Sequence, residues 1–258
     1  MILDRFRIEG KKALVTGASA GLGQAIAIAL AEAGADVACH GNTREPETTC
    51  AQIERLGRRA LAVQGDLSKS ESPREIFDET IKAFDRIDVL VNNAGTIRRA
   101  PAVEYSEEDW THVLEVNLSS VFRLCQLAGR HMIKRGEQGN DGGKIINIAS
   151  LLSFQGGINV PAYTAAKSGV AGLTKALANE WARHRINVNA IAPGYMRTDN
   201  TAALQADETR SRQILERIPA GRWGEPADLA GAALFLASPA SDYLHGHVMV
   251  VDGGWMGR

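Results

Sequence analysis

Short runs that are apolar almost throughout alternate along the chain with longer segments in which apolar residues recur every three or four positions. Such continuous apolar runs are typical of strands in a parallel sheet covered on both faces, because neither side of the strand meets water. The first run, "KALVTG", passes directly into a segment of small and apolar residues that ends at Gly34. The pattern predicts seven strands, at 12–17, 35–41, 59–66, 87–95, 143–150, 186–194 and 247–254.

Segments with helical periodicity separate these runs. One of them, 72–85, opens with Ser and Pro, which is a signature of a helix start, and another ends on Gly57. The regular alternation of strand and helix predicts an α/β fold over residues 1–258: a single doubly wound parallel sheet with helices on both faces. The expected helices cover 18–34, 46–57, 72–85, 107–135 with a break near Asn117, 161–183 and 225–238.

Residues 195–224 are the one long stretch in which this alternation is not clear. The stretch contains Gly, Pro and charged residues and follows the sixth expected strand. Loop insertions of this size in a compact domain are usually lids or binding loops. We therefore expect a substrate lid at about 195–224.

Composition narrows the class of protein. The chain is 45% hydrophobic and 23% charged, and its formal net charge of −1 favours neither nucleic acid nor an anionic membrane as a partner. No apolar run is long enough to span a bilayer, and the N-terminal residues lack the features of a secretory signal. The cysteines, Cys39, Cys50 and Cys125, are scattered, which is typical of reduced thiols. A cytoplasmic protein is expected.

A glycine-rich loop, "TGASAGLG" at 16–23, joins the first expected strand to its helix. Gly17 allows a tight turn, while Gly21 and Gly23 allow the backbone to approach a diphosphate closely. The N-terminus of the helix then faces the anion with free N–H groups. A plain turn with convenient glycines is the alternative, but the position on the first strand of a doubly wound sheet favours nucleotide binding.

The stretch "AYTAAKSGV" places Tyr163 and Lys167 four residues apart, on one face of the expected helix. A tyrosine ordinarily titrates near pH 10, so it is a poor base unless a nearby positive charge favours its phenolate. Lys167 would supply that charge. Taken alone, the pair is equally well explained as a helix start with one exposed lysine.

The motifs together, in this order, resemble the short-chain dehydrogenase/reductase family. The loop has the spacing T-G-x-x-x-G-x-G, "NNAG" ends the fourth expected strand, and Ser150 lies thirteen residues before Tyr163. "PG" at 193–194 follows the sixth strand, with Thr198 four residues later. The resemblance covers nearly the whole chain. It implies a Rossmann-like fold and hydride transfer between a nicotinamide and a carbinol or carbonyl carbon.

The same resemblance assigns catalytic roles to four residues. Tyr163 would be the general acid in reduction and the general base in oxidation. Lys167 would lower the pKa of the phenol and bind the nicotinamide ribose, and Ser150 would hold the carbonyl oxygen as charge develops on it. Asn117 would hold a water that connects Lys167 to solvent. The alternatives are that Ser150 caps a strand end and that Asn117 is a helix-kink residue bonded to backbone.

The resemblance also implies cofactor contacts along the carboxyl edge of the sheet. Asp66 matches a position whose carboxylate meets the adenine amino group, although capping of the next turn would explain it as well. The expected cofactor-binding residues are Gly17, Ser19, Gly21, Leu22, Gly23, Gly41, Asn42, Asp66, Leu67, Asn93, Ala94, Gly95, Tyr163, Lys167, Pro193, Gly194 and Thr198.

The choice of nicotinamide rests on the end of the second strand, where an acidic residue would bind the ribose 2′-hydroxyl and select NAD. Gly41 stands at that position, and Ala20 stands where NADP enzymes often have a basic residue. Arg44 could reach a 2′-phosphate, but Glu45 beside it argues against a clean anion site. We therefore expect NAD(H), with NADP(H) as the alternative.

Several segments, 96–110, 144–170, 179–201, 217–229 and 251–255, resemble family members that act on keto-sugar acids in uronate and pectin breakdown. Such a substrate needs a cation for its carboxylate, because a guanidinium can bind a carboxylate through two hydrogen bonds. The candidates are Arg98, Arg99 and Arg197, and Gln155 could meet substrate hydroxyls. Solvation, or pairing with nearby acidic residues, is the alternative for each arginine.

Other functions remain open at this point. The same chemistry could serve another carbonyl, such as a 3-ketoacyl thioester or a small ketone, and a non-catalytic nucleotide-binding scaffold could use the same fold. The "HGH" stretch at 245–247 has no third ligand at a suitable spacing, so no metal is expected. Relatives in the family are commonly homotetramers. The resemblance implies the same assembly here, with the helices at 107–135 and 161–183 packed against partner subunits.

Overall fold

The structure is a computed structural model that describes residues 1–139 and 142–258. Its core is one sheet of seven strands in the order β3-β2-β1-β4-β5-β6-β7, and every neighbouring pair is parallel. Each expected strand is present, and the sheet confirms the predicted fold class. The strands are β1 (Lys12–Val15), β2 (Asp36–Gly41), β3 (Ala60–Gln64), β4 (Val89–Asn92), β5 (Gly143–Ile148), β6 (Ile186–Pro193) and β7 (Val248–Val251).

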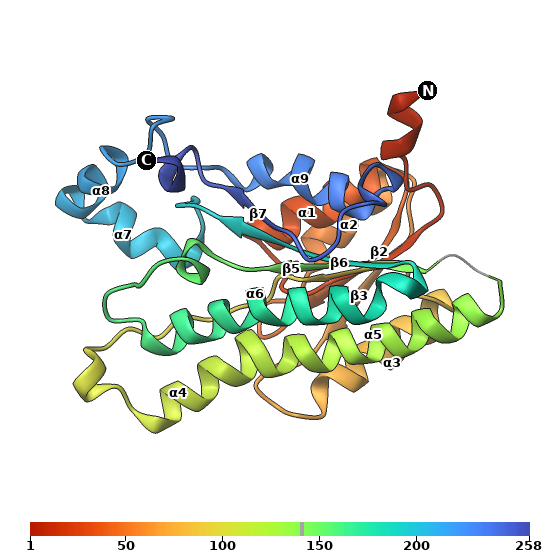
Figure 1. Ribbon diagram of the computed structural model, residues 1–258, viewed down its shortest axis with the longest axis horizontal. Coiled ribbons are helices and arrows are strands. Elements are labelled where there is room, and N and C mark those ends of the chain that lie inside the picture. Colours follow the sequence, from red (N-terminus) through yellow and green to blue (C-terminus); the bar gives the residue numbers. More distant parts are fainter. Residues whose placement is uncertain (140–141) are drawn as a thin grey trace.

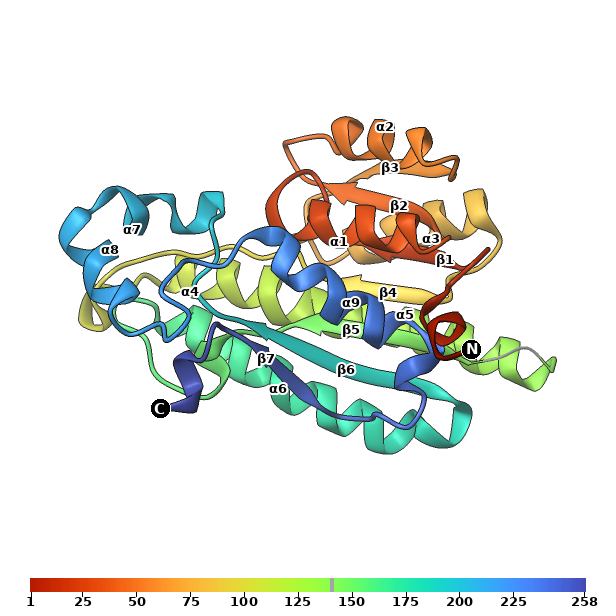
Figure 2. The same ribbon diagram turned by 90° about the horizontal axis from the view of Figure 1, so that it is seen from above.

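Helices cover both faces of the sheet (Figures 1 and 2). One layer consists of α1 (Gly21–Glu32), α2 (Glu47–Arg55) and α9 (Ala230–Ala237). The other consists of α3 (Ser72–Phe84), α5 (Ser120–Glu137) and α6 (Pro161–Trp181), with α4 (Glu107–Leu114) continuing the line of α5.

The two layers explain why the strands are apolar at successive positions. In β1, Ala13 and Val15 pack beneath α1, whereas Leu14 between them packs against the α5 layer, and all three are fully buried. Successive side chains of a strand point to opposite faces, so a strand between two helical layers needs apolar residues on both. The sheet is therefore the centre of two apolar cores.

The long helical stretch is interrupted by an irregular turn, and the expected lid contains helices. A π-helical turn, Glu115–Ser119, separates α4 from α5 at the place where the break was expected. The 195–224 stretch, expected as a loop insertion, instead carries α7 (Ala202–Ala206) and α8 (Glu208–Leu215). Asp207 begins α8 by accepting a hydrogen bond from the backbone N–H of Arg210 at 2.9 Å, a cap that hydrophobic periodicity alone does not reveal.

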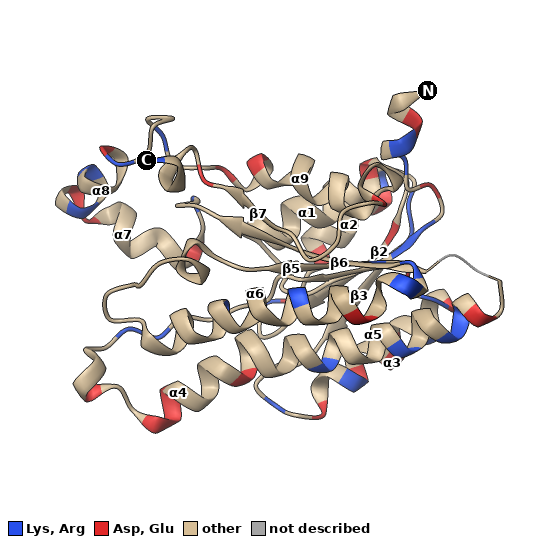
Figure 3. Ribbon diagram, in the orientation of Figure 1, with Lys and Arg blue, Asp and Glu red and all other residues tan. Residues whose placement is uncertain are grey.

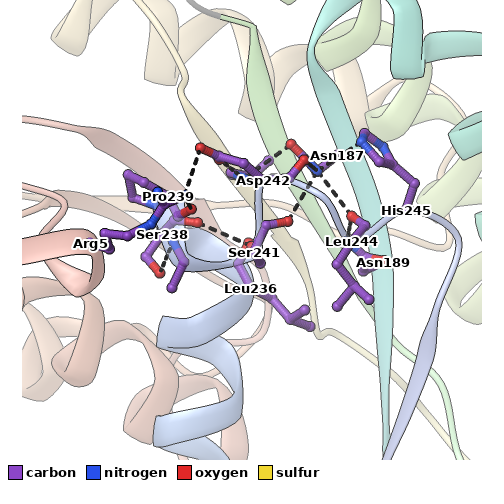
Figure 4. Close-up of polar contacts among 12 residues, drawn as sticks. Arg5, Asn187, Asn189, Leu236, Ser238, Pro239, Ser241, Asp242, Leu244 and His245 are labelled. Atoms are coloured by element: carbon purple, nitrogen blue, oxygen red, sulfur yellow. Dashed lines mark hydrogen bonds and ion pairs between the residues drawn. The ribbon is translucent and has the colours of Figure 1, made fainter. Parts of the chain in front are cut away.

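The connection between α9 and β7 is fastened to β6 at the amino edge of the sheet (Figure 4). The amide of Asn187 donates to the backbone carbonyl of Leu244 at 2.9 Å, and the amide of Asn189 donates to the same carbonyl at 2.8 Å. His245, from the "HGH" stretch, lies 3.2 Å from the Asn187 amide. These contacts hold β7 beside β6, so the chain that follows β7 reaches the carboxyl edge, where Trp255 lies.

Charged residues of both signs are spread over the outer helices and loops, and the central strands are almost free of them (Figure 3). In the part of the chain that the structure describes, no helix combines the length and apolarity that a membrane crossing requires.

Candidate active site

The carboxyl ends of the central strands border a cavity of about 280 Å³ that runs from the glycine loop to the start of α6. Most of the expected cofactor and catalytic residues line it: Gly17, Gly21, Leu22, Asn93, Ala94, Gly95, Ser150, Tyr163, Lys167, Pro193, Gly194 and Thr198. Ser19, Gly23, Gly41, Asn42, Asp66 and Leu67 do not line this cavity but belong to the glycine loop and the ends of β2 and β3. We call this space the nucleotide cavity.

At Gly17 and Gly23 the glycine loop is packed so closely that no side chain fits. Gly17 has a φ of +64°, and a Cβ there would lie 2.9 Å from the Cα of Ala94. A Cβ on Gly23 would lie 2.2 Å from the carbonyl oxygen of Gly17. The residue before α1, Ala20, offers no side-chain cap, so the first N–H groups of this helix are free to bind an anion.

Residues that the sequence analysis did not single out hold this loop. The hydroxyl of Thr16 accepts hydrogen bonds from the N–H groups of Asn93 and Ala94, both at 3.0 Å. The N–H of Gly17 donates to Nδ1 of His40 at 3.3 Å, and Nε2 of His40 bonds the carbonyl of Gly65 at 3.0 Å. Both bonds form together only when Nε2 carries the proton. Burial lowers the pKa of His40, which favours this neutral form.

The end of β2 cannot carry the acidic side chain that selects NAD in related folds. A Cβ on Gly41 would lie 2.3 Å from the carbonyl oxygen of Arg44 and 2.5 Å from Oγ of Ser19. The hydroxyl of Ser19 itself donates to that carbonyl at 2.5 Å. Arg44 extends toward the rim of the nucleotide cavity, where its Nη1 lies 3.6 Å from the carboxylate of Asp199.

The carboxylate of Asp66 caps the turn after β3. Its Oδ1 accepts from the N–H of Ser68 at 3.0 Å and from the Ser68 hydroxyl at 2.8 Å, and these bonds lower the pKa of Asp66. This is the alternative role that the sequence left open. The neighbouring Leu67 is buried in the core, and the backbone carbonyl of Asn42 accepts from the side chain of Gln64 at 2.9 Å.

Tyr163 and Lys167 lie one turn apart near the start of α6. Nζ of Lys167 is 5.7 Å from the centroid of the Tyr163 ring and donates to the carbonyl of Ile148 at 2.6 Å. Only 3% of Lys167 is exposed, and burial lowers its pKa from 10.5 to about 8. The hydroxyl of Ser150 accepts from the N–H of Leu152 at 3.2 Å, so Ser150 also caps the turn after β5.

The pKa of Tyr163 is raised, not lowered. Burial is the largest influence and raises the pKa of the phenol, while the hydrogen bond with Ser150 and the charge of Arg99 act in the opposite direction and are weaker. Burial has the largest effect on the pKa of both Tyr163 and Lys167. That Lys167 lowers the pKa of this phenol stays a prediction. Tyr163 is protonated at neutral pH and is suited to donate a proton.

Asn117 lies within the π-helical turn and is fully buried. Its Oδ1 accepts from the N–H of Thr96 at 3.1 Å, and its Nδ2 donates to the carbonyls of Thr96 and Val113 at 2.9 and 2.8 Å. The amide is bonded to backbone on both sides and does not line the nucleotide cavity. This geometry favours the helix-kink interpretation, in which Asn117 positions the loop after β4.

A second cavity, of about 320 Å³, lies on the other side of Ser150 and Tyr163, which line both. Its walls come from the loop after β5, from α7 and α8, and from the C-terminal Trp255. Three arginines line it (Arg99, Arg210 and Arg217), and no acidic residue is among the described residues that do. We call this space the cationic cavity.

Two of the four predicted substrate residues, Arg99 and Gln155, line the cationic cavity. The other two do not. Arg98 lies 3.5 Å from the carboxylate of Asp109, and Arg197 lies 2.9 Å from that of Glu225. Arg210, Arg217 and Trp255 were not predicted as substrate residues, although Arg217 and Trp255 lie in segments that carry the resemblance, because they reach the cavity only through the folding of the lid and the C-terminus.

Comparisons with known proteins agree with this geometry. A family model described as enoyl-(acyl carrier protein) reductase matches residues 17–256. The chain is 56% identical over 258 residues to 2-dehydro-3-deoxy-D-gluconate 5-dehydrogenase of Escherichia coli, and the match covers 100% of both.

Two solved structures are similar over nearly the whole chain. One, described as a 2-deoxy-D-gluconate 3-dehydrogenase from Agrobacterium tumefaciens with bound NADP, is 55% identical at a TM-score of 0.91 and covers 99% of this chain and 100% of its own. The other is a gluconate 5-dehydrogenase from Burkholderia cenocepacia in complex with NADP and tartrate. It is 41% identical at a TM-score of 0.92, and the match covers 100% of each chain.

Proposed function

Because the chain belongs to the short-chain dehydrogenase/reductase family, we propose that it interconverts a secondary alcohol and a ketone on a keto-sugar acid, in the manner of 2-dehydro-3-deoxy-D-gluconate 5-dehydrogenase. One observation carries the proposal: a cavity suited to a dinucleotide and a cavity with three arginines meet at Ser150 and Tyr163. The substrate is then an anion whose reacting carbon lies beside Tyr163. The reaction then belongs to the breakdown of uronates and pectin.

The glycine loop fits a nicotinamide dinucleotide, because Gly17 and Gly23 leave no room for a Cβ and the first turn of α1 is free to bind phosphate. The bound nicotinamide supplies or accepts the hydride. In the direction of reduction, Tyr163 donates its proton to the carbonyl oxygen as that oxygen gains negative charge. Ser150 donates a hydrogen bond to the same oxygen.

Lys167 supports Tyr163 through its positive charge. Its ammonium lies beside the phenol ring and is held by the carbonyl of Ile148, so it stabilises the phenolate left after proton donation. In the direction of alcohol oxidation the same residues act in reverse, and the phenolate accepts the proton. Asn117 acts at a distance, by fixing the loop that follows "NNAG".

For the choice of nicotinamide, we propose that NADP(H) is accepted. The preference for NAD(H) expected from the sequence has no support from the two structural relatives, which contain NADP. Gly41 provides no carboxylate against a 2′-phosphate, and Arg44 lies at the rim with only the exposed Asp199 as its partner in the described chain. The 2′-phosphate would replace that carboxylate at the guanidinium.

Steady-state kinetics of Arg44→Gln with both cofactors test this choice. The KM for NADPH should rise about tenfold, as expected for loss of one charge-assisted hydrogen bond, while the KM for NADH stays unchanged. Equal values for NADPH in the wild type and the variant would remove Arg44 from the site. A wild type that uses NADH alone would restore the original expectation.

The substrate class is tested by following nicotinamide absorbance with a panel of ketones. We expect turnover of keto-sugar acids and weak or no turnover of a neutral ketone of similar size. A 3-ketoacyl thioester belongs in the panel, because it represents the main rival substrate. Faster turnover of the thioester than of every keto-sugar acid would overturn the proposal.

The homotetramer implied by the family resemblance is also a proposal. Phe122 on α5 and Tyr243 and Val250 near β7 are exposed apolar side chains, which a protein interface would cover. Light scattering on the purified protein gives the mass directly. A monomeric mass would contradict this proposal without affecting the assignment of the reaction.

A further inference from the structure

Arg217 is held on an aromatic platform in the wall of the cationic cavity. Its guanidinium carbon lies 3.9 Å from the centroid of the Trp255 ring, close enough for a cation–π interaction. Trp255 is itself fixed: it is 5% exposed, its Nε1 donates to Oε1 of Gln155 at 3.3 Å, and its ring lies 4.7 Å from that of Tyr195. The cation therefore has a defined position before any ligand arrives.

The guanidinium of Arg217 forms no ion pair with a carboxylate in the described residues, 1–139 and 142–258. Two other arginines of the same lid do: Arg197 with Glu225 at 2.9 Å and Arg222 with Asp228 at 2.6 Å. Both of those lie outside the cationic cavity. A planar guanidinium with free donors in a cavity that lacks acidic residues is suited to a carboxylate, which it can bind through two hydrogen bonds.

The three arginines of the cationic cavity differ in position. Arg99 lies at the end where the proton is transferred, because it contacts Asn200, which lines both cavities as Tyr163 does. Its Nη2 is engaged by this contact, with the carbonyl of Asn200 at 3.1 Å. Arg210 donates to its helix neighbour Gln213 at 3.2 Å and has no aromatic ring beneath it in the described chain.

The chemistry of the substrate decides among these arginines. In a keto-sugar acid of the proposed type, the carboxyl carbon is several bonds from the carbon that gains or loses hydride. When that carbon lies beside Tyr163, the carboxylate must lie farther along the cavity than Arg99. We propose that Arg217, positioned by Trp255, binds the substrate carboxylate, and that the free amide N–H groups of Gln155 bind beside it. The proposal rests on the function proposed above.

The test compares a keto-sugar acid with its uncharged methyl ester. Arg217→Gln should raise the KM for a keto-sugar acid about 10- to 100-fold, as expected for loss of a charge-assisted pair, and leave kcat within about threefold. The KM for the methyl ester of the same compound should not rise, and the KM for the cofactor should not rise either. The matched control is Arg212→Gln, which removes an exposed arginine of α8 that lies close to Arg217 along the chain but does not line the cavity.

Three results would overturn the assignment: an unchanged KM for the acid, an equal rise for the acid and its ester, or a selective rise in Arg99→Gln in place of Arg217→Gln. Trp255→Leu should reproduce part of the effect, because it removes the ring that positions the guanidinium, whereas Trp255→Phe should retain most of the affinity. The melting temperature of each variant shows whether it is folded.

A second measurement separates this proposal from the proposed function. D-gluconate and the neutral polyol D-glucitol are titrated by calorimetry into the full-length enzyme saturated with NADP. Gluconate should bind more tightly than glucitol, and Arg217→Gln should remove the difference while Arg212→Gln retains it. If no keto-sugar acid is turned over but this difference is found, the function fails and the anion site stands. An equal affinity for both compounds in the wild type would refute the anion site.

Discussion

The two cavities that meet at Tyr163 are built from different parts of the chain. The nucleotide cavity is bordered by the glycine loop, by the ends of neighbouring strands and by the start of the lid, and its shape depends on positions that carry no side chain, such as Gly17 and Gly23. The cationic cavity consists of long side chains from segments far apart in the sequence, the loop after β5, the lid and the C-terminus. One side is fixed by backbone geometry and the other by side-chain placement.

This difference predicts how each side responds to change. At Gly17 and Gly23 the backbone cradle for a phosphate has no room for an added Cβ, because that atom collides with main chain, which must then shift. A cavity lined by exposed arginines tolerates substitution in folding and changes only in what it binds.

The largest effect should come from Tyr163, one of the residues that line both cavities. Tyr163→Phe removes the proton donor and should lower kcat by about 10²- to 10⁴-fold, while the affinity for the dinucleotide stays within about twofold. Tyr195→Phe is the control, because Tyr195 lines the cationic cavity but not the nucleotide cavity. Steady-state kinetics and a cofactor titration check both statements. Turnover retained in Tyr163→Phe would end the assignment of Tyr163 as acid and base.

The next effect concerns the backbone cradle. Gly23→Ala places a Cβ 2.2 Å from the Gly17 carbonyl and 2.4 Å from Nδ2 of Asn93, so the loop must shift. We expect a loss of about 1–3 kcal/mol in the free energy of unfolding, and a loss of dinucleotide affinity larger than for any substitution in the cationic cavity. Gly231→Ala in α9 is the control, since a Cβ there meets no atom within 4 Å. Wild-type affinity in Gly23→Ala would show that the loop is adaptable.

The same contrast separates what the sequence revealed from what it did not. The strands, the glycine loop and the Tyr163–Lys167 pair were predictable, because periodicity and short-range spacing express them directly. The roles of Arg98 and Arg197 were not, since each pairs with a carboxylate brought near by folding. Arg217 and Trp255 lie in segments that resemble relatives, but the sequence does not show that they face the substrate, because they are far from Tyr163 along the chain and reach the same cavity only through folding.

The roles of buried polar side chains are also not predictable from sequence spacing. Asn117 was recognised by its place in a motif, yet the structure bonds its amide to backbone, and Asp66 likewise caps a turn. His40 occupies a strand end that reads as ordinary apolar sequence. Whether such a residue binds a ligand or the protein's own backbone depends on which groups folding brings within about 3 Å of it, a distance typical of hydrogen bonds.

The third prediction uses the pKa of Lys167, about 8 as a result of burial. The ammonium is lost as the pH rises through 8, whereas the phenol of Tyr163, whose pKa is raised above 10, stays protonated. In the free enzyme, kcat/KM for reduction should therefore fall about tenfold per pH unit above pH 8, and tyrosinate absorbance should not accompany the fall. A fall that coincides with tyrosinate formation would assign the titration to Tyr163 instead.

Lys167 also makes stability depend on pH. Its folded pKa lies below the unfolded value, so between about pH 8 and 10.5 the unfolded chain binds more protons than the native one. The burial of the charged form costs about 3 kcal/mol below pH 8, and this cost is relieved as the pH rises through that window. Lys167→Met should remove this dependence in denaturant titrations at pH 7 and pH 10. An unchanged dependence in the variant would show that another group titrates.

The smallest effect on binding and turnover should come from His40, which acts on the glycine loop through Gly17 and on the end of β3 through Gly65. His40→Leu leaves both backbone groups without a partner and should cost about 1–3 kcal/mol in the free energy of unfolding. His40→Asn keeps an acceptor at the δ position for the Gly17 N–H and should cost less. Because the histidine touches only the nucleotide side, the dinucleotide Kd should rise a few-fold in the leucine variant while the KM for the keto-sugar acid and kcat at saturation stay unchanged.

The pH dependence of the same variants provides the discriminating measurement. Burial holds the folded pKa of His40 below its ordinary value of 6.5, so the unfolded chain is protonated first as the pH falls. The native state therefore loses stability as the pH drops from about 6.5 toward the folded pKa, and His40→Asn should lessen that loss in parallel denaturant titrations. If both variants bind the dinucleotide as the wild type does, His40 is a packing residue. If the leucine variant alone is weakened, the cradle depends on a side chain as well as on its glycines, and the contrast between the two cavities narrows at this one position.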